Sequence, residues 1–160
     1  MGLQAILLLL SPALIGPGEA APMDFGRLDR AVSKCSMVKA DQAIPCQRLQ
    51  LTQSDITGLR IRFIGSSPEA EGITHRLTFL TGAPIDGQAL ECDSGRCRLT
   101  QSAWEGQIFS AAWGSFDHRG LPLGLPSSQK GRGRCRIVGK RLSCESQFRD
   151  GLTLSAEARL

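Results

Sequence analysis

Tyrosine is absent from this 160-residue sequence, and aromatic residues make up only 5% of it. Surfaces that stack on nucleic-acid bases or sugar rings depend on exposed aromatic side chains. The composition therefore argues against a broad stacking platform. Trp113 alternates with Phe109 and is expected in the core, whereas Trp104 is expected at a strand end, where its indole would be an isolated sugar contact.

The motifs of common enzyme classes are also missing. The sequence has no Gly-x-Ser-x-Gly nucleophile elbow, no dinucleotide fingerprint and no His-x-x-x-His spacing. Residues 133–140 have neither the spacing nor the Ser or Thr of a phosphate-binding loop. We therefore expect no catalytic residue, no cofactor and no metal. The alternative is a periplasmic or secreted hydrolase that uses His118 and Asp117 with a serine.

No apolar run reaches the roughly 20 residues that a membrane-spanning helix needs. Residues 3–15 instead have the length of a secretory signal core, and Gly18 and Ala20 precede Ala21 at a cleavage-site spacing. We expect residues 1–20 to be a signal peptide and residues 21–160 to be one periplasmic or secreted domain without a transmembrane span. Residues 1–5 contain no Lys or Arg, which leaves a buried N-terminal segment or a misassigned start as the alternative.

Six cysteines follow the expected cleavage site, and an even number in an exported chain indicates disulfides. Cys92 and Cys97 flank Ser94-Gly95, a pair suited to a two-residue hairpin turn. In that register the two cysteines face each other with Cα atoms about 4.5 Å apart, within reach of a disulfide. The same register pairs Glu91 with Arg98, Asp93 with Arg96, and Leu90 with Leu99.

A second hairpin is predicted around Gly139-Lys140, which suits a type II′ turn. It places Cys135 opposite Cys144 and Ile137 opposite Leu142. Cys35–Cys46 is then the third disulfide by elimination. The rival interpretation is a reduced cytoplasmic protein that binds zinc through Cys92, Cys97, Cys135 and Cys144, although the eight residues between the last two are atypical for zinc.

Alternation of apolar and polar residues predicts strands along most of the chain. The clearest are around Leu49 and Leu51, from Leu59 to Phe63, from Thr74 to Thr81, and after Leu152. Gln107 to Trp113 is apolar on both faces, which is typical of a strand in the middle of the core. Residues 24–39 have apolar residues at three- and four-residue spacing, which predicts a short N-terminal helix. The predicted fold is mainly β: a small antiparallel sandwich or barrel-like domain of eight or nine strands, stapled by disulfides.

The charge distribution contains the most suggestive functional signal. Nineteen Lys and Arg against fifteen Asp and Glu give a net charge of +4, but residues 119–141 hold seven bases and no acid. Guanidinium groups suit sulfate, phosphate and carboxylate. We therefore expect a non-enzymatic binding or structural protein of the envelope or the secreted fraction, contacting an anionic polysaccharide or another polyanion. The expected contact residues are Arg132, Arg134, Arg136, Lys140 and Arg141.

Overall fold

A computed structural model describes residues 25–55, 58–82 and 87–160. These residues form twelve strands and no helix. The strands are β1 (Gly26–Ala31), β2 (Cys35–Lys39), β3 (Gln42–Pro45), β4 (Arg48–Asp55), β5 (Gly58–Ser66), β6 (Thr74–Thr81), β7 (Leu90–Asp93), β8 (Gly95–Leu99), β9 (Ala103–Phe116), β10 (Ser127–Val138), β11 (Arg141–Gln147) and β12 (Thr153–Arg159).

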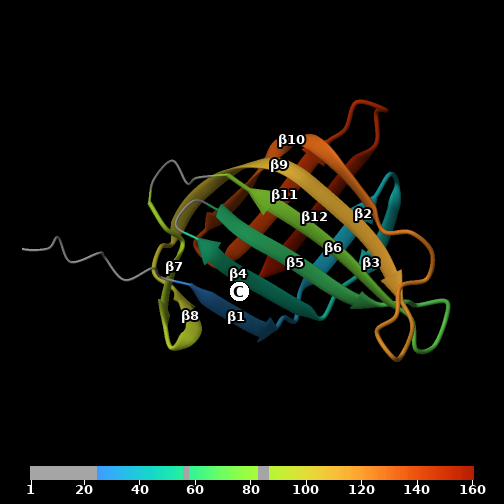
Figure 1. Cartoon of the computed structure of the whole chain (residues 1–160), viewed down its shortest axis with the longest axis horizontal. Helices are drawn as coiled ribbons and strands as arrows, with labels where there is room; N and C mark the ends of the chain where they lie inside the picture. The colour runs from blue at the N-terminus through green and yellow to red at the C-terminus, as the bar shows by residue number, and fades with distance from the viewer. Residues whose placement is uncertain (1–24, 56–57, 83–86) are drawn as a thin grey trace, which may run out of the picture.

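All twelve strands belong to one sheet, in the order β3-β2-β12-β11-β10-β9-β6-β5-β4-β1-β8-β7. Neighbouring strands are antiparallel except for the parallel pair β1 and β8. The sheet curls into a half-barrel, in which β4, β5, β6 and β9 cross in front of β10, β11 and β12 (Figure 1). We call these the front half and the back half. The curl brings β3 against β5, where Gly65 passes so close to the Pro45 carbonyl that a Cβ would collide with it.

The core fills the inside of the curl, because each strand turns alternate side chains inward. Phe63 and Phe79 come from the front half and pack edge to face, with ring centroids 6.1 Å apart. Ile137 and Leu142 come from the back half and are also fully buried. The other side chains of each strand form the outer face, so function has to be sought there or at the ends of the half-barrel.

Both predicted hairpins are confirmed in register. Cys92 pairs with Cys97 and Cys135 with Cys144, and both pairs are disulfides with Cα atoms 4.0 Å apart. Positive φ at Ser94 and Gly95 fits a type I′ turn, and positive φ at Gly139 fits the predicted type II′ turn. The third disulfide, Cys35–Cys46, is also present and joins β2 to the residue that follows β3.

The predicted helix over residues 24–39 is not found. From residue 25 onward this stretch forms β1 and β2 instead. β1 pairs along its whole length with β4, and β2 lies between β12 and β3. Four apolar residues at helix-like spacing are a weak preference for helix, and the backbone pairing offered by neighbouring strands overrides it.

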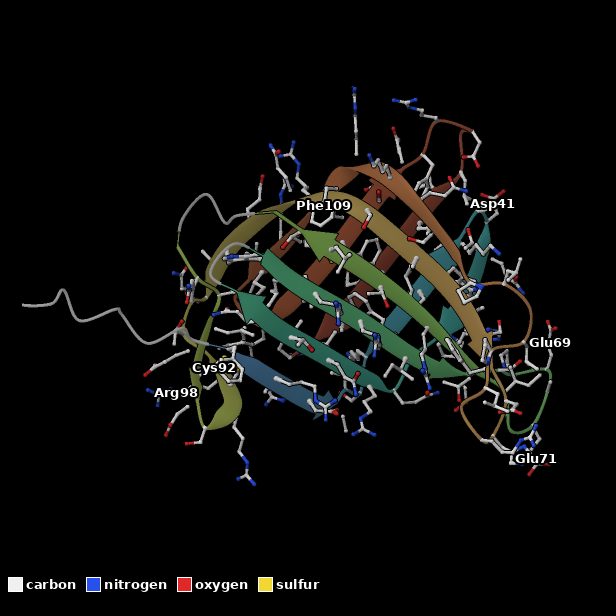
Figure 2. All side chains as sticks on the ribbon, viewed as in Figure 1. Asp41, Glu69, Glu71, Cys92, Arg98 and Phe109 are labelled. Carbon is white, nitrogen blue, oxygen red and sulfur yellow. A yellow bond between two sulfur atoms is a disulfide. The ribbon has the colours of Figure 1, made fainter. Side chains whose placement is uncertain are left out.

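The environments of Trp104 and Phe109 also differ from the prediction. Trp104 is only 4% exposed, whereas Phe109 is 54% exposed; Phe109 is labelled on β9 in Figure 2. The cause is a bulge in β9: Leu80 pairs with Ser110 but Thr81 pairs with Ile108, so Phe109 is an extra residue. The inward face therefore changes from the even-numbered to the odd-numbered residues at this point. Trp113 is buried, as expected.

Candidate functional site

The residues of the hydrolase alternative do not form a catalytic arrangement. His118 is exposed in the loop between β9 and β10. Asp117 organises that loop, because its carboxylate accepts hydrogen bonds from the backbone N–H groups of Arg119 and Leu121 and from the Arg119 guanidinium. The geometry thus gives Asp117 a structural role, and among the described residues His118 forms no hydrogen bond with a hydroxyl.

The second histidine, His75, contacts a hydroxyl but lacks a catalytic setting. Its Nδ1 lies 2.9 Å from Ser115 Oγ and its ring stacks on Trp113 with centroids 5.6 Å apart. Burial lowers the pKa of His75, while the charge of Glu69 raises it by a smaller amount. No carboxylate among the described residues accepts a hydrogen bond from the ring, so this pair reads as packing at one end of the half-barrel.

Zinc has no site among the cysteines, because all six are in disulfides. In the part of the chain that the structure describes, no group of three or more His, Cys, Asp or Glu side chains could hold a metal ion.

The described residues also contain no helix long and apolar enough to cross a membrane.

The basic residues predicted as contacts lie on the outer face of β10 and β11, with Lys140 in the turn between them, but acids share much of that surface. Glu105 on β9 pairs with both Arg136 (2.7 Å) and Arg134 (3.1 Å), and the hydrogen bond from Arg136 is the main reason that the pKa of Glu105 is lowered. Arg141 pairs with Glu157 at 3.4 Å. Arg132 and Lys140 are exposed and have no ion pair with a described residue. The structure therefore leaves this segment less cationic than its sequence indicates.

A more strongly cationic surface lies on the outer face of the front half. Cross-strand pairing lines up its outward residues in three rows: Ala31-Arg48-Ile64-Arg76, Asp29-Gln50-Arg62-Thr78 and Arg27-Thr52-Arg60-Leu80. Five arginines from four strands thus share one surface, which we call the arginine face: Arg27, Arg48, Arg60, Arg62 and Arg76. Asp29 is the one acid in these rows.

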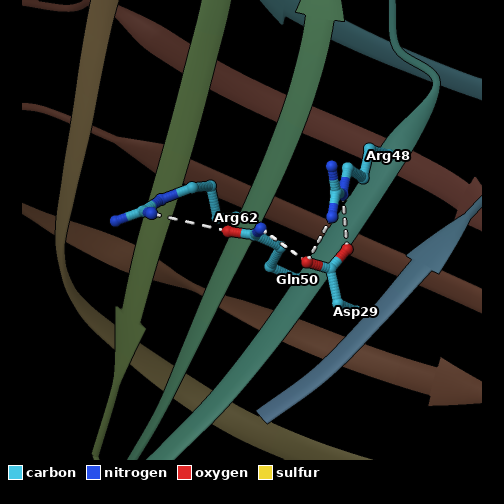
Figure 3. Close-up of polar contacts among 4 residues, drawn as sticks. All are labelled: Asp29, Arg48, Gln50 and Arg62. Carbon is cyan, nitrogen blue, oxygen red and sulfur yellow. Dashed lines mark hydrogen bonds and ion pairs between the residues drawn. The ribbon is translucent and has the colours of Figure 1, made fainter. Parts of the chain in front are cut away.

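Asp29 is already engaged by its neighbours (Figure 3). Its two carboxylate oxygens accept hydrogen bonds from Arg48, at 2.5 and 2.8 Å, and one of them also accepts a bond of 2.8 Å from the Gln50 amide. The hydrogen bond from Arg48 is the main reason that the pKa of Asp29 is lowered. Among the described residues, the other four arginines of the face form no ion pair, which leaves their charges uncompensated.

Arg62 lies at the centre of these uncompensated charges. It is half-buried, and its guanidinium reaches only neutral oxygens: Nε donates to Thr78 Oγ1 at 3.3 Å, and a terminal nitrogen lies 3.5 Å from Gln50 Oε1. Burial is the largest cause that lowers the pKa of Arg62, followed by the charges of Arg76, Arg60 and Arg27. Both causes disfavour the charged form of Arg62, and the opposite charge of an anion placed here would offset them.

Arg76 is held in place on the same face by an aromatic ring. Its guanidinium carbon lies 3.9 Å from the centroid of Phe116, and Phe116 lies over Gly114, where a Cβ would come within 3.0 Å of the ring and force it to shift. Arg76 Nε is buried without a hydrogen-bond partner in the described structure. The ring therefore fixes a guanidinium whose terminal nitrogens, rather than the buried Nε, have N–H donors to offer a ligand.

This arrangement can bind oxyanions. Same-face neighbours along a strand are about 7 Å apart, and diagonal neighbours on adjacent strands about 7–8 Å apart, so Arg60, Arg62 and Arg76 can serve one anionic group or successive groups of a polymer. The alternation of Arg60 and Arg62 with apolar residues in the sequence places both on an outer face. Their assembly with Arg76 and Arg27 depends on the strand order, which the sequence does not display.

Comparison of the chain with protein-family models, with curated proteins and with solved structures finds no match.

Proposed function

We propose that this protein is a non-enzymatic binding protein of the periplasm or the secreted fraction, and that the arginine face contacts an anionic polysaccharide. The observation that carries the proposal is the charge imbalance of that face, where five arginines surround one acid that is already paired. Sulfate, phosphate and carboxylate groups match the fork of donors on a guanidinium. This moves the polyanion site from β10 and β11 to the front half.

An oxidising compartment is compatible with the three disulfides. Residues 1–20, the expected signal peptide, lie outside the described residues, so export rests on the sequence pattern and on the disulfides. An exported protein meets anionic polysaccharides at the cell surface and in the surrounding medium, which agrees with the proposed partner.

A polysaccharide is favoured over a single-stranded nucleic acid because, among the described residues, the four strands of the arginine face present no exposed aromatic ring, and the exposed Phe109 is a single ring on neighbouring β9. The aromatic residues of β5 and β6, Phe63 and Phe79, are fully buried, and the Phe116 ring is covered by Arg76. Single-stranded nucleic acids gain much of their binding energy from stacking of bases on exposed aromatic rings.

Heparin, a sulfated polysaccharide, tests the proposal. The chain carrying Arg62→Gln and Arg76→Gln should elute from a heparin column at lower salt than the wild-type chain. Because each lost contact reduces the number of counterions released, the slope of log affinity against log salt should fall by about 2.

The matched control carries Arg134→Gln and Arg136→Gln, which removes the same charge from β10. We expect this control to shift elution much less, because Glu105 already pairs with both of its arginines. Equal shifts in the elution salt concentration of the two variants would show that heparin binding depends on net charge and not on the arginine face, which would contradict the proposal. A shift confined to the control would return the site to the β10–β11 hairpin and contradict the proposal.

A further inference from the structure

The outer face of the back half contains a hollow that the proposed function does not use. Its volume is about 310 Å³, at the lower end of the range for small-molecule sites. Ten residues line it: Ser36, Val38, Arg134, Arg136, Ser143, Cys144, Glu145, Ser155, Ala156 and Glu157. We propose that this hollow binds an uncharged, polyhydroxylated ligand, a neutral saccharide.

The hollow is formed by two straight cross-strand rows. One row reads Arg136-Ser143-Glu157-Ser36 across β10, β11, β12 and β2, and the next reads Arg134-Glu145-Ser155-Val38 across the same strands. Small serine side chains stand on the two central strands at Ser143 and Ser155, while longer charged side chains stand around them. The hollow exists because the short serine side chains form its base and the longer charged side chains form its sides.

Hydrogen-bonding groups in the hollow remain open. Among the described residues, the hydroxyls of Ser36, Ser143 and Ser155 have no hydrogen-bond partner, and each can donate one bond and accept others. Arg134 and Arg136 each contact Glu105 through one nitrogen, which leaves further N–H donors of these guanidiniums. The carboxylate of Glu145 forms no ion pair with a described residue, so acceptors are present as well as donors.

Charge separates this hollow from the arginine face. Two arginines and two glutamates line the hollow, so their formal charges cancel. A polyanion would meet Glu145 and Glu157 and gain little, whereas the hydroxyl groups of a sugar can donate to carboxylates and accept from guanidiniums and serines. Arg134 and Arg136, expected from the sequence to contact polyanions, are thus reassigned to a neutral ligand.

Binding to an array of neutral and sulfated glycans tests the inference, with the mature chain as the probe. We expect the wild-type chain to bind at least one neutral glycan, and Ser143→Val with Ser155→Val to weaken that binding at least tenfold by removing two hydroxyls and filling the floor. Ser128→Val, at an exposed position of β10 outside the hollow, is the matched control and should leave binding unchanged. Ser36→Val at the rim is the second variant if the double variant does not fold.

Three results would overturn the inference: no neutral glycan is bound, only sulfated glycans are bound, or the serine variants that fold bind neutral glycans as well as the wild type does. Elution of the same serine variant from heparin should equal that of the wild type. The two proposals can therefore fail separately, since the Arg62 and Arg76 substitutions should not alter binding of neutral glycans.

Discussion

At the scale of single residues, Asp29 connects Arg48 and Gln50 on the arginine face through hydrogen bonds. It neutralises Arg48 and orients Gln50, which in turn lies beside Arg62. Because the pKa of Asp29 is lowered in the folded chain, its contribution to stability is fully present above the unfolded-state pKa of about 3.9 and is lost as pH falls through the folded-state value.

Replacement of Asp29 by Asn should therefore destabilise the protein at pH 7 and have little effect at pH 2. The side chain is partly exposed and the ion pair lies at the surface, so we expect a loss of about 0.5–1 kcal/mol at pH 7. Urea denaturation at both pH values measures this difference, with the exposed Asp41→Asn as the control. An equal loss at pH 2 would show that the carboxylate charge is not responsible.

At the scale of strands, local sequence patterns were sufficient to predict strands that pair with their neighbours in the sequence. Both disulfide hairpins follow from turn residues and register, and alternation locates β5, β6 and β12. These patterns predict the structure wrongly where pairing with strands distant in the sequence determines it. Residues 26–39 look helical but pair with β4 and β12, and the bulge at Phe109 reverses the faces of β9.

β10 depends on glycine where it bends across the top of the half-barrel. Its register shifts between Lys130 and Gly133, and a Cβ at Gly133 would collide with the backbone carbonyl of Glu145 on β11. Gly133→Ala should lower the free energy of unfolding by about 2–3 kcal/mol, because a backbone has to move. Gly82→Ala is the control, since a Cβ there meets open space. Equal stability of the two variants in urea denaturation would contradict this prediction.

At the scale of the whole molecule, the arginine face shows why the site was not predictable from the sequence. The run of bases between Arg119 and Arg141 is prominent in the chain, yet the fold brings Glu105 and Glu157 beside it. Arg27, Arg60, Arg62 and Arg76 are separated by up to 49 residues and meet only through the order β6-β5-β4-β1. A high density of basic residues along the sequence therefore does not by itself produce a high density of positive charge on the folded surface.

Export and cross-linking predict the mass of the protein recovered from its host. Alkylated without prior reduction, it should lack residues 1–20, carry no alkyl group and weigh six hydrogens less than the reduced chain, because all six cysteines are paired. Intact-mass spectrometry gives the answer directly, and reduction before alkylation is the control. A full-length chain with six alkylated thiols would contradict both export and the disulfides.

The two rims of the sheet are its shortest strands, and each has a disulfide at its side. β3 and β7 have four residues each and lie on opposite sides of the molecule (Figure 1). Cys35–Cys46 ties the end of β3 to β2, and Cys92–Cys97, of which Cys92 is labelled in Figure 2, ties β7 to β8. β3 lies against β5, whereas β7 ends the sheet, so its outer backbone groups are able to pair with another chain. Cys92–Cys97 limits fraying of this edge, so a reducing environment would expose the molecule to edge-to-edge polymerisation through β7 before its core was lost.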